Sequence, residues 1–289
     1  MSKKVKKPIV AVVTRTRDRP LFLKRAISSI AEQTFTDYVH VIVNDGGDRE
    51  TLESIIGDLD AATRDRIRLF HRDSASQGPD TIFSESADRV DSEYIVMHDD
   101  DDTWHPEFLE RTHAVLKTGA VGVAVRTDRV YEKATEDKID IKSKIRYMPD
   151  VDSISLYRQC YENLLTPILF IYSREVYETV GKYDDTMTVA GDWEFGIRFL
   201  SRYDIEYLDP GFALANYHQR VNRRDNSYAQ HSHRQQITRV TNKYLRRDLE
   251  NGSLGLGYII NKLRYDHDDR VRLLKKLTPK SLYRKLRRR

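Results

Sequence analysis

Four consecutive aspartates, Asp99, Asp100, Asp101 and Asp102, follow a short apolar run at residues 94–97. Adjacent carboxylates repel one another, so such a run in a folded domain calls for a counter-charge, and a hard divalent cation that prefers oxygen ligands can supply it. Side chains alternate in extended backbone, so the first and third aspartates can face one way and the second and fourth the other. The pattern predicts a strand that ends in carboxylates able to hold Mg²⁺ or Mn²⁺ against the phosphates of a ligand. The alternative is a solvated acidic loop.

A larger framework must position these aspartates, and the first hundred residues show a regular one. Short apolar runs rich in β-branched residues alternate with helical patterns, which is typical of strands buried on both faces of a parallel sheet. The runs are at residues 9–13, 39–43, 67–70 and 94–97, and the helical patterns between them are at residues 20–33, 49–59 and 79–90. We therefore expect an α/β sheet, mostly parallel, with right-handed crossovers and flanking helices.

Polar side chains follow each of these runs. Sheets of this kind bind ligands at the carboxyl ends of their strands, and Thr14, Arg15, Asp45, Arg72 and the aspartate run stand there. We expect these clusters to converge on one crevice. Asp45 and Arg72 have plainer alternatives, an ordinary turn aspartate and a surface arginine.

The rest of the chain is less regular. Helices are expected at residues 106–117, 173–180 and 193–200, and strands at residues 121–125 and 168–172. The first of these strands is followed by a polar stretch, expected to be irregular, that reaches about residue 152. From about residue 222 the composition becomes polar and basic. We therefore divide the chain into residues 1–220, which hold the sheet, and residues 221–289, a helical and basic C-terminal extension.

Composition limits the class of protein. The 289 residues are 39% hydrophobic and 33% charged, and their formal net charge of +4 does not suit a uniformly basic nucleic-acid binder. Cys160 is the only cysteine, so no intramolecular disulfide is possible and a reducing compartment is expected. No apolar stretch approaches the roughly 18 residues of a transmembrane helix, and the run behind the N-terminal lysines is too short for a signal peptide. We expect a cytoplasmic protein, soluble or attached to a membrane surface.

In order along the chain, the motifs resemble those of family 2 glycosyltransferases with the GT-A fold. Residues 12–20 are similar to the family's opening strand and turn, residues 43–47 to its second strand end, and residues 94–107 to its strand with the Asp-x-Asp-Asp motif. Residues 180–184 and 191–194 resemble its late motifs, and residues 217–218 its closing region. The turn Arg15-Thr16-Arg17-Asp18 is more basic than in the family, and Gly191 stands where the family usually has Glu.

The resemblance implies a role for each motif. It implies that Asp99 and Asp101 bind a Mn²⁺ or Mg²⁺ ion, with His218 as a further ligand; a structural histidine is the alternative for His218. It implies that Asp45 accepts the imino hydrogen of a uracil-like base. The residues expected to bind the nucleotide-sugar are Thr14, Arg15, Thr16, Arg17, Asp45, Arg72, Asp99, Asp100 and Trp193.

Asp192 is the implied general base, which takes the proton of an acceptor hydroxyl as this attacks the anomeric carbon of the sugar. The resemblance implies a direct displacement that inverts that carbon, for which one carboxylate is enough. An aspartate at this point also suits a helix N-cap. Trp193 is expected to form an apolar face for a sugar ring, with a core aromatic as the alternative.

The leading hypothesis is a metal-dependent inverting glycosyltransferase that uses a nucleotide-sugar, in the first place a UDP-sugar. One alternative is a sugar-phosphate nucleotidyltransferase, which the absence of glycine from the turn after the first strand disfavours. The other is a non-enzymatic membrane-surface or RNA-binding protein, which leaves the aspartate run and Asp192 unexplained.

The C-terminal tail adds a partner. Residues 271–289 contain nine lysines and arginines and no acidic residue, with leucines interleaved at helical spacing. Basic amphipathic segments bind anionic membranes. We therefore expect a peripheral protein at the inner face of the cell membrane, with a glycan or lipid-linked acceptor, in cell-surface glycan assembly. A disordered solubilising tail, or a helix that pairs with another chain, is the alternative.

Overall fold

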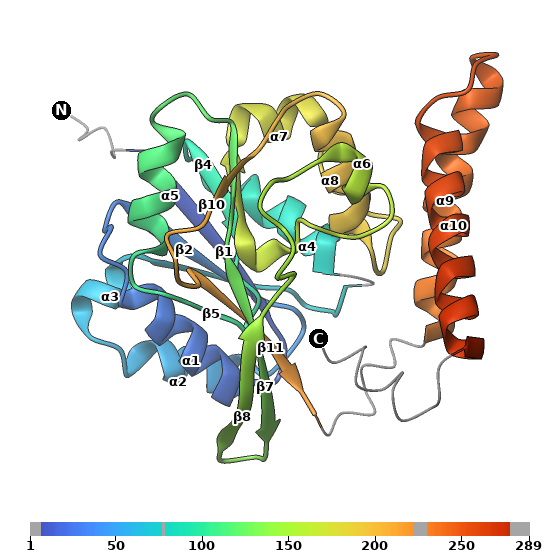
Figure 1. Ribbon diagram of the computed structural model, residues 1–289. Coiled ribbons are helices and arrows are strands. Elements are labelled where there is room, and N and C mark those ends of the chain that lie inside the picture. The colour runs from blue at the N-terminus through green and yellow to red at the C-terminus, as the bar shows by residue number, and fades with distance from the viewer. Residues whose placement is uncertain (1–6, 77–78, 222–229, 278–289) are drawn as a thin grey trace.

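The computed structural model describes residues 7–76, 79–221 and 230–277, and a twisted sheet flanked by helices lies at its centre (Figure 1). The strands of this sheet are β1 (Val10–Thr16), β2 (Tyr38–Asn44), β3 (Ile67–His71), β4 (Tyr94–Met97), β6 (Gly122–Val125), β9 (Phe170–Ser173) and β10 (Glu206–Leu208). Their order is β10-β6-β9-β4-β1-β2-β3, and only β9, among the described strands of this sheet, runs antiparallel to its neighbours. The expected mostly parallel α/β sheet is confirmed.

Apolar packing on both faces holds this sheet. Val12 of β1 and Val96 of β4 are fully buried. Helix α1 begins at Pro20, whose fixed φ suits a first helical turn, and packs Leu23 and Ile27 against Ile42 of β2. Burial of one such side chain contributes about 1.5–3 kcal/mol, so the core fixes where each strand ends. The described helices on this domain are α1 (Pro20–Ala31), α2 (Arg49–Gly57), α3 (Ala61–Asp65), α4 (Pro79–Ala87), α5 (Phe108–Leu116), α6 (Leu156–Gln159), η1 (Pro167–Leu169), α7 (Arg174–Val180) and α8 (Gly191–Leu200).

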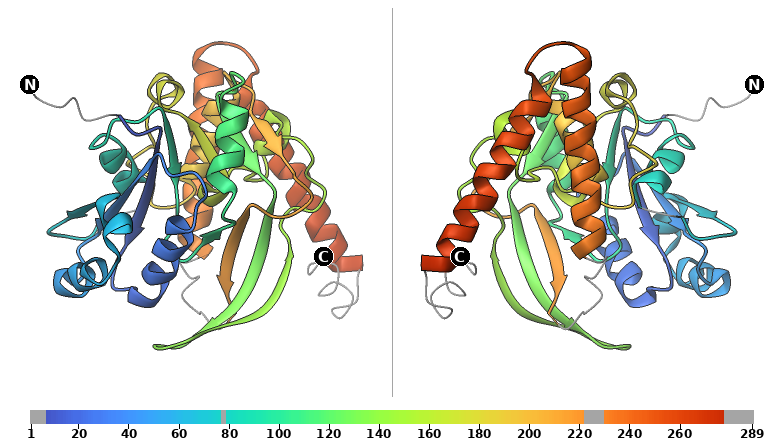
Figure 2. Two further views of the ribbon diagram at one scale, coloured as in Figure 1. Left: turned by 90° about the vertical axis from the view of Figure 1, so that its left-hand side faces the viewer. Right: turned by 90° about the vertical axis from the view of Figure 1, so that its right-hand side faces the viewer.

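The polar stretch up to about residue 152 was expected to be irregular. That prediction is wrong, because the stretch contributes two strands to a second sheet. It contains β5 (Thr103–Trp104), β11 (Ala215–Arg220), β7 (Thr127–Ala134) and β8 (Ile139–Arg146), in that order across the sheet. The β7–β8 hairpin extends away from the main sheet (Figures 1 and 2). Its residues are largely charged, and β8 is mostly exposed, so the strands lack the apolar runs by which buried strands are predicted.

Two long helices follow the sheets, α9 (Gln230–Glu250) and α10 (Leu256–Leu277), and stand as a pair beside the domain (Figure 2). Val240, Tyr244 and Ile260 from this pair share a buried cluster with Trp193 and Ile197 of α8. The two helices approach very closely, because a Cβ atom on Gly257 would lie 2.3 Å from the Tyr244 carbonyl group. The helical character of the extension is confirmed, and its division from the sheet domain after residue 220 stays a prediction.

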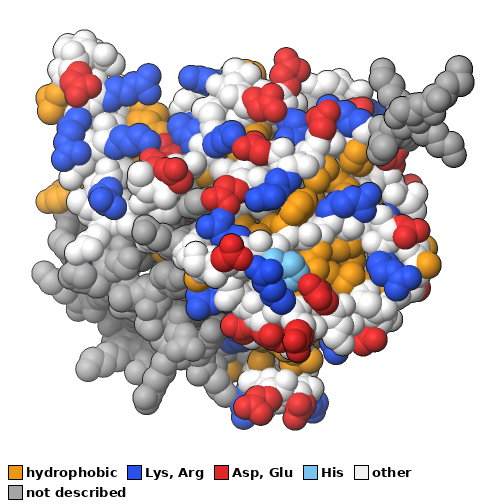
Figure 3. Space-filling view, turned by 180° about the vertical axis from the view of Figure 1, so that it is seen from behind, with side chains coloured by type: hydrophobic (Ala, Val, Ile, Leu, Met, Phe, Trp, Pro, Cys, Tyr) orange, Lys and Arg blue, Asp and Glu red, His pale blue; other side chains and the backbone are white. Residues whose placement is uncertain are grey.

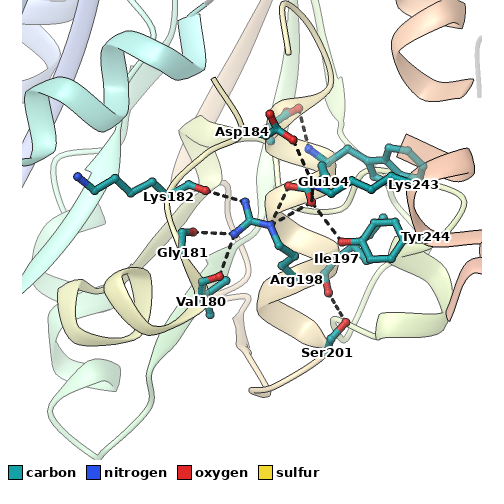
Figure 4. A network of polar contacts seen from close by, with 12 residues as sticks. Val180, Gly181, Lys182, Asp184, Glu194, Ile197, Arg198, Ser201, Lys243 and Tyr244 are labelled. Carbon is teal, nitrogen blue, oxygen red and sulfur yellow. Dashed lines mark hydrogen bonds and ion pairs between the residues drawn. The ribbon is translucent and has the colours of Figure 1, made fainter. Parts of the chain in front are cut away.

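A buried carboxylate also ties the helix pair to α8 (Figure 4). The fully buried Glu194 accepts hydrogen bonds from Arg198 at 2.8 and 3.0 Å, and from Lys243 and Tyr244 of α9 at 3.2 Å each. Arg198 also donates to the carbonyl groups of Val180, Gly181 and Lys182. The network thereby joins α8, the chain after α7 and α9.

The described residues on the face shown in Figure 3 form no single broad basic patch. None of the described helices is both long and apolar enough to cross a membrane. On the face shown in Figure 3, lysines and arginines lie among aspartates and glutamates around apolar areas. A face of mixed charge does not favour a nucleic acid, whose affinity comes largely from its phosphates.

Candidate active site at the carboxyl ends of the central strands

The aspartate run forms a tight turn where β4 leaves the sheet. The Asp102 N–H donates to the Asp99 carbonyl at 3.2 Å, so the chain turns here and is not extended as expected. The four aspartate side chains nevertheless alternate between buried and partly exposed positions. Asp100 and Asp102 are 2% and 1% exposed, whereas Asp99 and Asp101 are partly exposed. The two carboxylates predicted to bind a metal are therefore the two that solvent can reach.

Part of the counter-charge comes from arginines that sequence reasoning missed. Arg19 donates to the carboxylates of Asp100 and Asp101, and Arg220 at the end of β11 donates to the same oxygen of Asp101 at 2.8 Å. Arg25 of α1 donates to the Asp101 carbonyl. Arg19 directly precedes Pro20 in the opening motif, but Arg220 lies far away along the chain and carries no local signal.

The counter-charge is incomplete. Within the described residues the Asp99 carboxylate forms no hydrogen bond or ion pair, and burial together with the charges of Asp101 and Asp100 raises its pKa to about 7. Burial, Asp101 and Asp99 likewise raise the pKa of Asp102 well above its ordinary range. A divalent cation fits this donor set, since Mg²⁺ is often held by one or two carboxylates plus substrate phosphates. In the described part of the chain no three Asp, Glu, His or Cys side chains converge to hold a metal without such help.

His218 lies behind the turn, with both ring nitrogens engaged by the protein. Nδ1 lies 2.7 Å from Glu132 Oε2 and Nε2 lies 2.9 Å from Thr103 Oγ1. The His218 backbone N–H donates to Asp102 Oδ1 at 2.7 Å. A metal would have to displace the Thr103 hydroxyl from Nε2. The role of His218 as a metal ligand stays a prediction, and its visible role is to support Asp102.

The ends of β1, β2 and β3 bring Arg15, Asp45 and Arg72 together as expected. Arg15 Nε and Nη2 lie 3.0 and 2.8 Å from Asp45 Oδ2, and Arg72 Nε lies 3.5 Å from Asp45 Oδ1. Ser76, which the sequence did not indicate, donates its N–H to Asp45 Oδ1 at 2.8 Å. Asp45 is fully buried under these groups, so the turn holds it rigidly at the strand end.

The side chains of the opening turn differ in their exposure: Thr14 and Thr16 are buried, and Arg17 is exposed. Thr14 is fully buried and its hydroxyl lies 2.9 Å from His40 Nε2, so its side chain supports β1, and its nucleotide contact stays a prediction. The Thr16 hydroxyl donates to Asp100 Oδ2 at 2.8 Å, so Thr16 positions a carboxylate. Arg17 is exposed, and its nucleotide contact stays a prediction.

Asp192 lies in the first turn of α8. The N-cap of this helix is Ala190, in a left-handed conformation with φ 63°, so the alternative of Asp192 as the N-cap is excluded. Asp192 Oδ1 accepts the Trp193 N–H at 2.8 Å, and Oδ2 accepts Asn163 Nδ2 at 2.7 Å. Asn163, which the sequence did not indicate, therefore orients the carboxylate. Ala190, a non-glycine residue in the left-handed region, lies two residues before Asp192, and such strained residues are common at functional sites.

Trp193 is a core residue, and its predicted role as a face for a sugar ring is wrong. It is 3% exposed, and its indole N–H donates to the Gln159 carbonyl at 2.6 Å. The guanidinium of Arg264 from α10 lies 5.1 Å from its ring centroid. Helices of the C-terminal extension therefore cover the ring that was expected to face the ligand.

Known proteins resemble the chain in both sequence and fold. Residues 10–181 match the family described as Glycosyl transferase family 2. A curated relative, the GalNAc(5)-diNAcBac-PP-undecaprenol beta-1,3-glucosyltransferase of Campylobacter jejuni, is 32% identical over 95 residues, which are 33% of this chain and 30% of that protein. The chain covers about a third of the length of the first curated relatives it matches.

Solved structures give the same fold at low sequence identity. The S. aureus TarS fragment 1–349 in complex with UDP-GlcNAc has a TM-score of 0.60 at 18% identity and covers 76% of this chain and 61% of that one. The mannosyltransferase PcManGT from Pyrobaculum calidifontis, in complex with GDP-Man and Mn²⁺, has a TM-score of 0.62 at 14% identity and covers 90% and 70%. The GT-A fold expected from the motifs is confirmed, and the chain belongs to glycosyl transferase family 2.

Proposed function

We propose that this chain transfers a sugar from a nucleotide-sugar, in the first place a UDP-sugar, to a hydroxyl group of a glycan or lipid-linked acceptor. One observation carries the proposal, the incomplete counter-charge at the aspartate turn. Arg19 and Arg220 both bind Oδ2 of Asp101, so Oδ1 of Asp101 and the carboxylate of Asp99 keep no partner among the described residues. Asp99 and Asp101 would hold Mn²⁺ or Mg²⁺, and when bound the ion supplies positive charge to the leaving diphosphate.

The protein's own groups have separate tasks in this proposal. Asp45 Oδ2 accepts from Arg15 and the Ser76 hydroxyl, and Oδ1 accepts from the Ser76 N–H. A uracil-like base would have to displace one of these donors before its imino hydrogen could reach the carboxylate. Arg17 is exposed at the same strand end and can reach a phosphate. These contacts bind and orient the donor before any bond changes.

Asp192 acts as the general base. It removes the proton of the acceptor hydroxyl while the oxygen attacks the anomeric carbon, and the bond to the diphosphate breaks. A single displacement of this kind inverts the anomeric centre and needs no protein nucleophile. Asn163 donates to one carboxylate oxygen of Asp192, which fixes the direction in which the base points.

Release of nucleotide tests the proposed function directly. The full chain is incubated with a panel of UDP-sugars and GDP-sugars, with and without Mn²⁺, and the products are separated by chromatography. A transferase yields nucleoside diphosphate, most rapidly from one donor and only with the cation. Consumption of a sugar phosphate and nucleoside triphosphate with release of pyrophosphate would instead indicate a nucleotidyltransferase. The absence of any nucleotide product with every donor would contradict the enzymatic assignment.

The C-terminal tail is proposed to attach the enzyme to a membrane that carries its acceptor. The structure describes α10 up to Leu277 and no side chain beyond residue 266, so the basic residues at 271–289 lie outside the described side chains. Support comes from the composition of the tail and from the Campylobacter relative, whose name includes a PP-undecaprenol acceptor. Co-sedimentation with anionic vesicles, for the full chain and a chain truncated after Asp269, tests it. Equal sedimentation of the two would remove the membrane role.

A further inference from the structure

We propose that a polar cavity beside Asp192 is the acceptor subsite, and that Arg129 in this cavity selects an acceptor carrying a negative charge, a carboxylate or a phosphate ester. The inference rests on the proposed function, because it takes Asp192 as the base. The cavity has a volume of about 400 Å³, within the roughly 300–1,000 Å³ range of small-ligand sites. It lies between the β7–β8 hairpin and the chain before η1, where no motif was found in the sequence.

The cavity adjoins the proposed reaction centre. Asn163 lines it and donates to Asp192 Oδ2 at 2.7 Å, so the cavity wall directly contacts the base. Tyr147 forms another part of the wall and packs against Tyr217, with ring centroids 5.6 Å apart. Burial raises the pKa of Tyr217, and the charge of Asp102 raises it further. The cavity thus touches the base through Asn163, and Tyr147 and Tyr217 lead from it toward the aspartate turn.

Arg129 is the charged side chain of the cavity lining that has no opposite charge in contact among the described residues. Every other charged side chain of the lining has an opposite charge within 3.0 Å, contributed by a described residue. These ion pairs are Arg146–Asp209 at 2.8 Å, Asp150–Arg158 at 3.0 Å and Glu162–Arg158 at 2.8 Å. Arg129 forms no ion pair with any described residue. Arg158 serves both Asp150 and Glu162, so the lining carries no net positive charge, and Arg129 is its cation without a paired anion among the described residues.

The Arg129 guanidinium is also held ready for a ligand. Its central carbon lies 4.6 Å from the ring centroid of Tyr147, and its Nε–H is buried without a hydrogen-bond partner among the described residues. Its described contacts are thus with the uncharged Tyr147, through the ring and a side-chain hydrogen bond, and they leave the Nε–H without a partner. A planar guanidinium with free donors binds a carboxylate or a phosphate through two parallel hydrogen bonds.

Paired sugars that differ in one charge test the inference. Methyl β-D-glucuronide, glucose 6-phosphate and the neutral methyl β-D-glucoside are titrated against the full chain by saturation-transfer NMR, with UDP and Mn²⁺ present. We expect at least one anionic sugar to bind tenfold or more tightly than the neutral one, and the stronger of the two identifies carboxylate or phosphate. Equal affinity of charged and neutral sugars, or no binding by any of them, would overturn the inference.

Variants assign the preference to one residue. Arg129→Gln should abolish it, and Lys142→Gln, which removes an exposed charge from the adjacent strand β8, should leave it unchanged. Arg129→Lys keeps the charge and should retain a reduced preference, which makes the test independent of whether Arg129→Gln folds. A preference that persists in Arg129→Gln, or one that is lost in Arg129→Lys, would refute the role of this side chain.

A parallel measurement of nucleotide release without acceptor separates the two proposals. Anionic preference without release from any donor would refute the proposed function and leave the binding inference intact. Release from a donor without anionic preference would refute the inference alone. Release that continues in Arg129→Gln, together with lost preference, is the result we expect from an acceptor-selecting residue.

Discussion

Replacement of Glu132 by Gln tests whether a buried charge supports the aspartate turn. Glu132 lies on β7 and is fully buried. Arg25 donates to it at 2.6 and 3.2 Å, and His218 Nδ1 lies 2.7 Å away. Arg25 also donates to the Asp101 carbonyl, and the His218 N–H donates to Asp102. Glutamine keeps the shape of the side chain and removes the charge that holds both partners.

The pKa of Glu132 gives the magnitude of this effect. Burial raises the pKa, but the hydrogen bonds and charges of His218 and Arg25 outweigh burial and lower it from 4.5 to about 2. At ~1.4 kcal/mol for each pKa unit, the ionised carboxylate stabilises the fold by about 3 kcal/mol at pH 7. Because the folded state has the lower pKa, this contribution is complete above pH 4.5 and is lost as the pH falls toward 2. It is about 2 kcal/mol at pH 3.5.

Urea unfolding of the full chain measures the difference at both pH values. Glu136→Gln, which removes an exposed glutamate from the β7–β8 connection, serves as the control and should unfold like the parent. We expect Glu132→Gln to be less stable by about 3 kcal/mol at pH 7, and the gap to the parent to narrow at pH 3.5. A gap under about 1 kcal/mol at pH 7, or one of constant size at the two pH values, would refute the reasoning.

Three further predictions concern the base, the metal and the helix pair. Asp192→Asn should lower turnover about a thousandfold, ~4 kcal/mol of barrier, while a donor titration shows unchanged binding; turnover within a few-fold of the parent would place the base elsewhere. Asp101→Ala should abolish cation-dependent nucleotide release with an unchanged circular dichroism spectrum, and full parent activity in excess chelator would remove the metal role. Gly257→Ala should force α10 away from the Tyr244 backbone and cost about 1–3 kcal/mol in thermal unfolding, unlike Gly57→Ala, where the added methyl meets open space.

Strands of the central sheet could be predicted from the sequence because burial on both faces requires apolar residues along them. Strands β1, β2 and β4 have neighbours on both sides in the sheet, so apolar residues occupy most positions along them. Strands β7 and β8 pair only with each other and β11, and β8 faces solvent along most of its length. Nothing in such a polar sequence distinguishes a strand from a loop.

The same physical distinction applies to the site. Asp45 and Asp99 could be located because parallel strands place their carboxyl ends at one edge of the sheet. Arg220 could not, since it reaches Asp101 from a strand more than a hundred residues later. Trp193 was misassigned for a related reason. Arg264 of α10 and several members of the buried cluster of Trp193 belong to the C-terminal helices, and no local pattern at residue 193 indicates that cover.

The aspartate turn contains two kinds of carboxylate, and the difference bears on how the site works. Asp100 is buried and satisfied by Thr16 and Arg19, and an arginine stays protonated at any pH the protein meets. These contacts hold the turn without any ligand. Asp99 is buried enough for its pKa to rise, yet it has no cationic partner in contact among the described residues. The chain thus supplies the arginine charge that holds the turn in shape. Among the described residues it supplies no contacting cation for Asp99, the carboxylate that faces the crevice. Under the proposed function, donor and cation supply that remaining charge to a turn that is already in place.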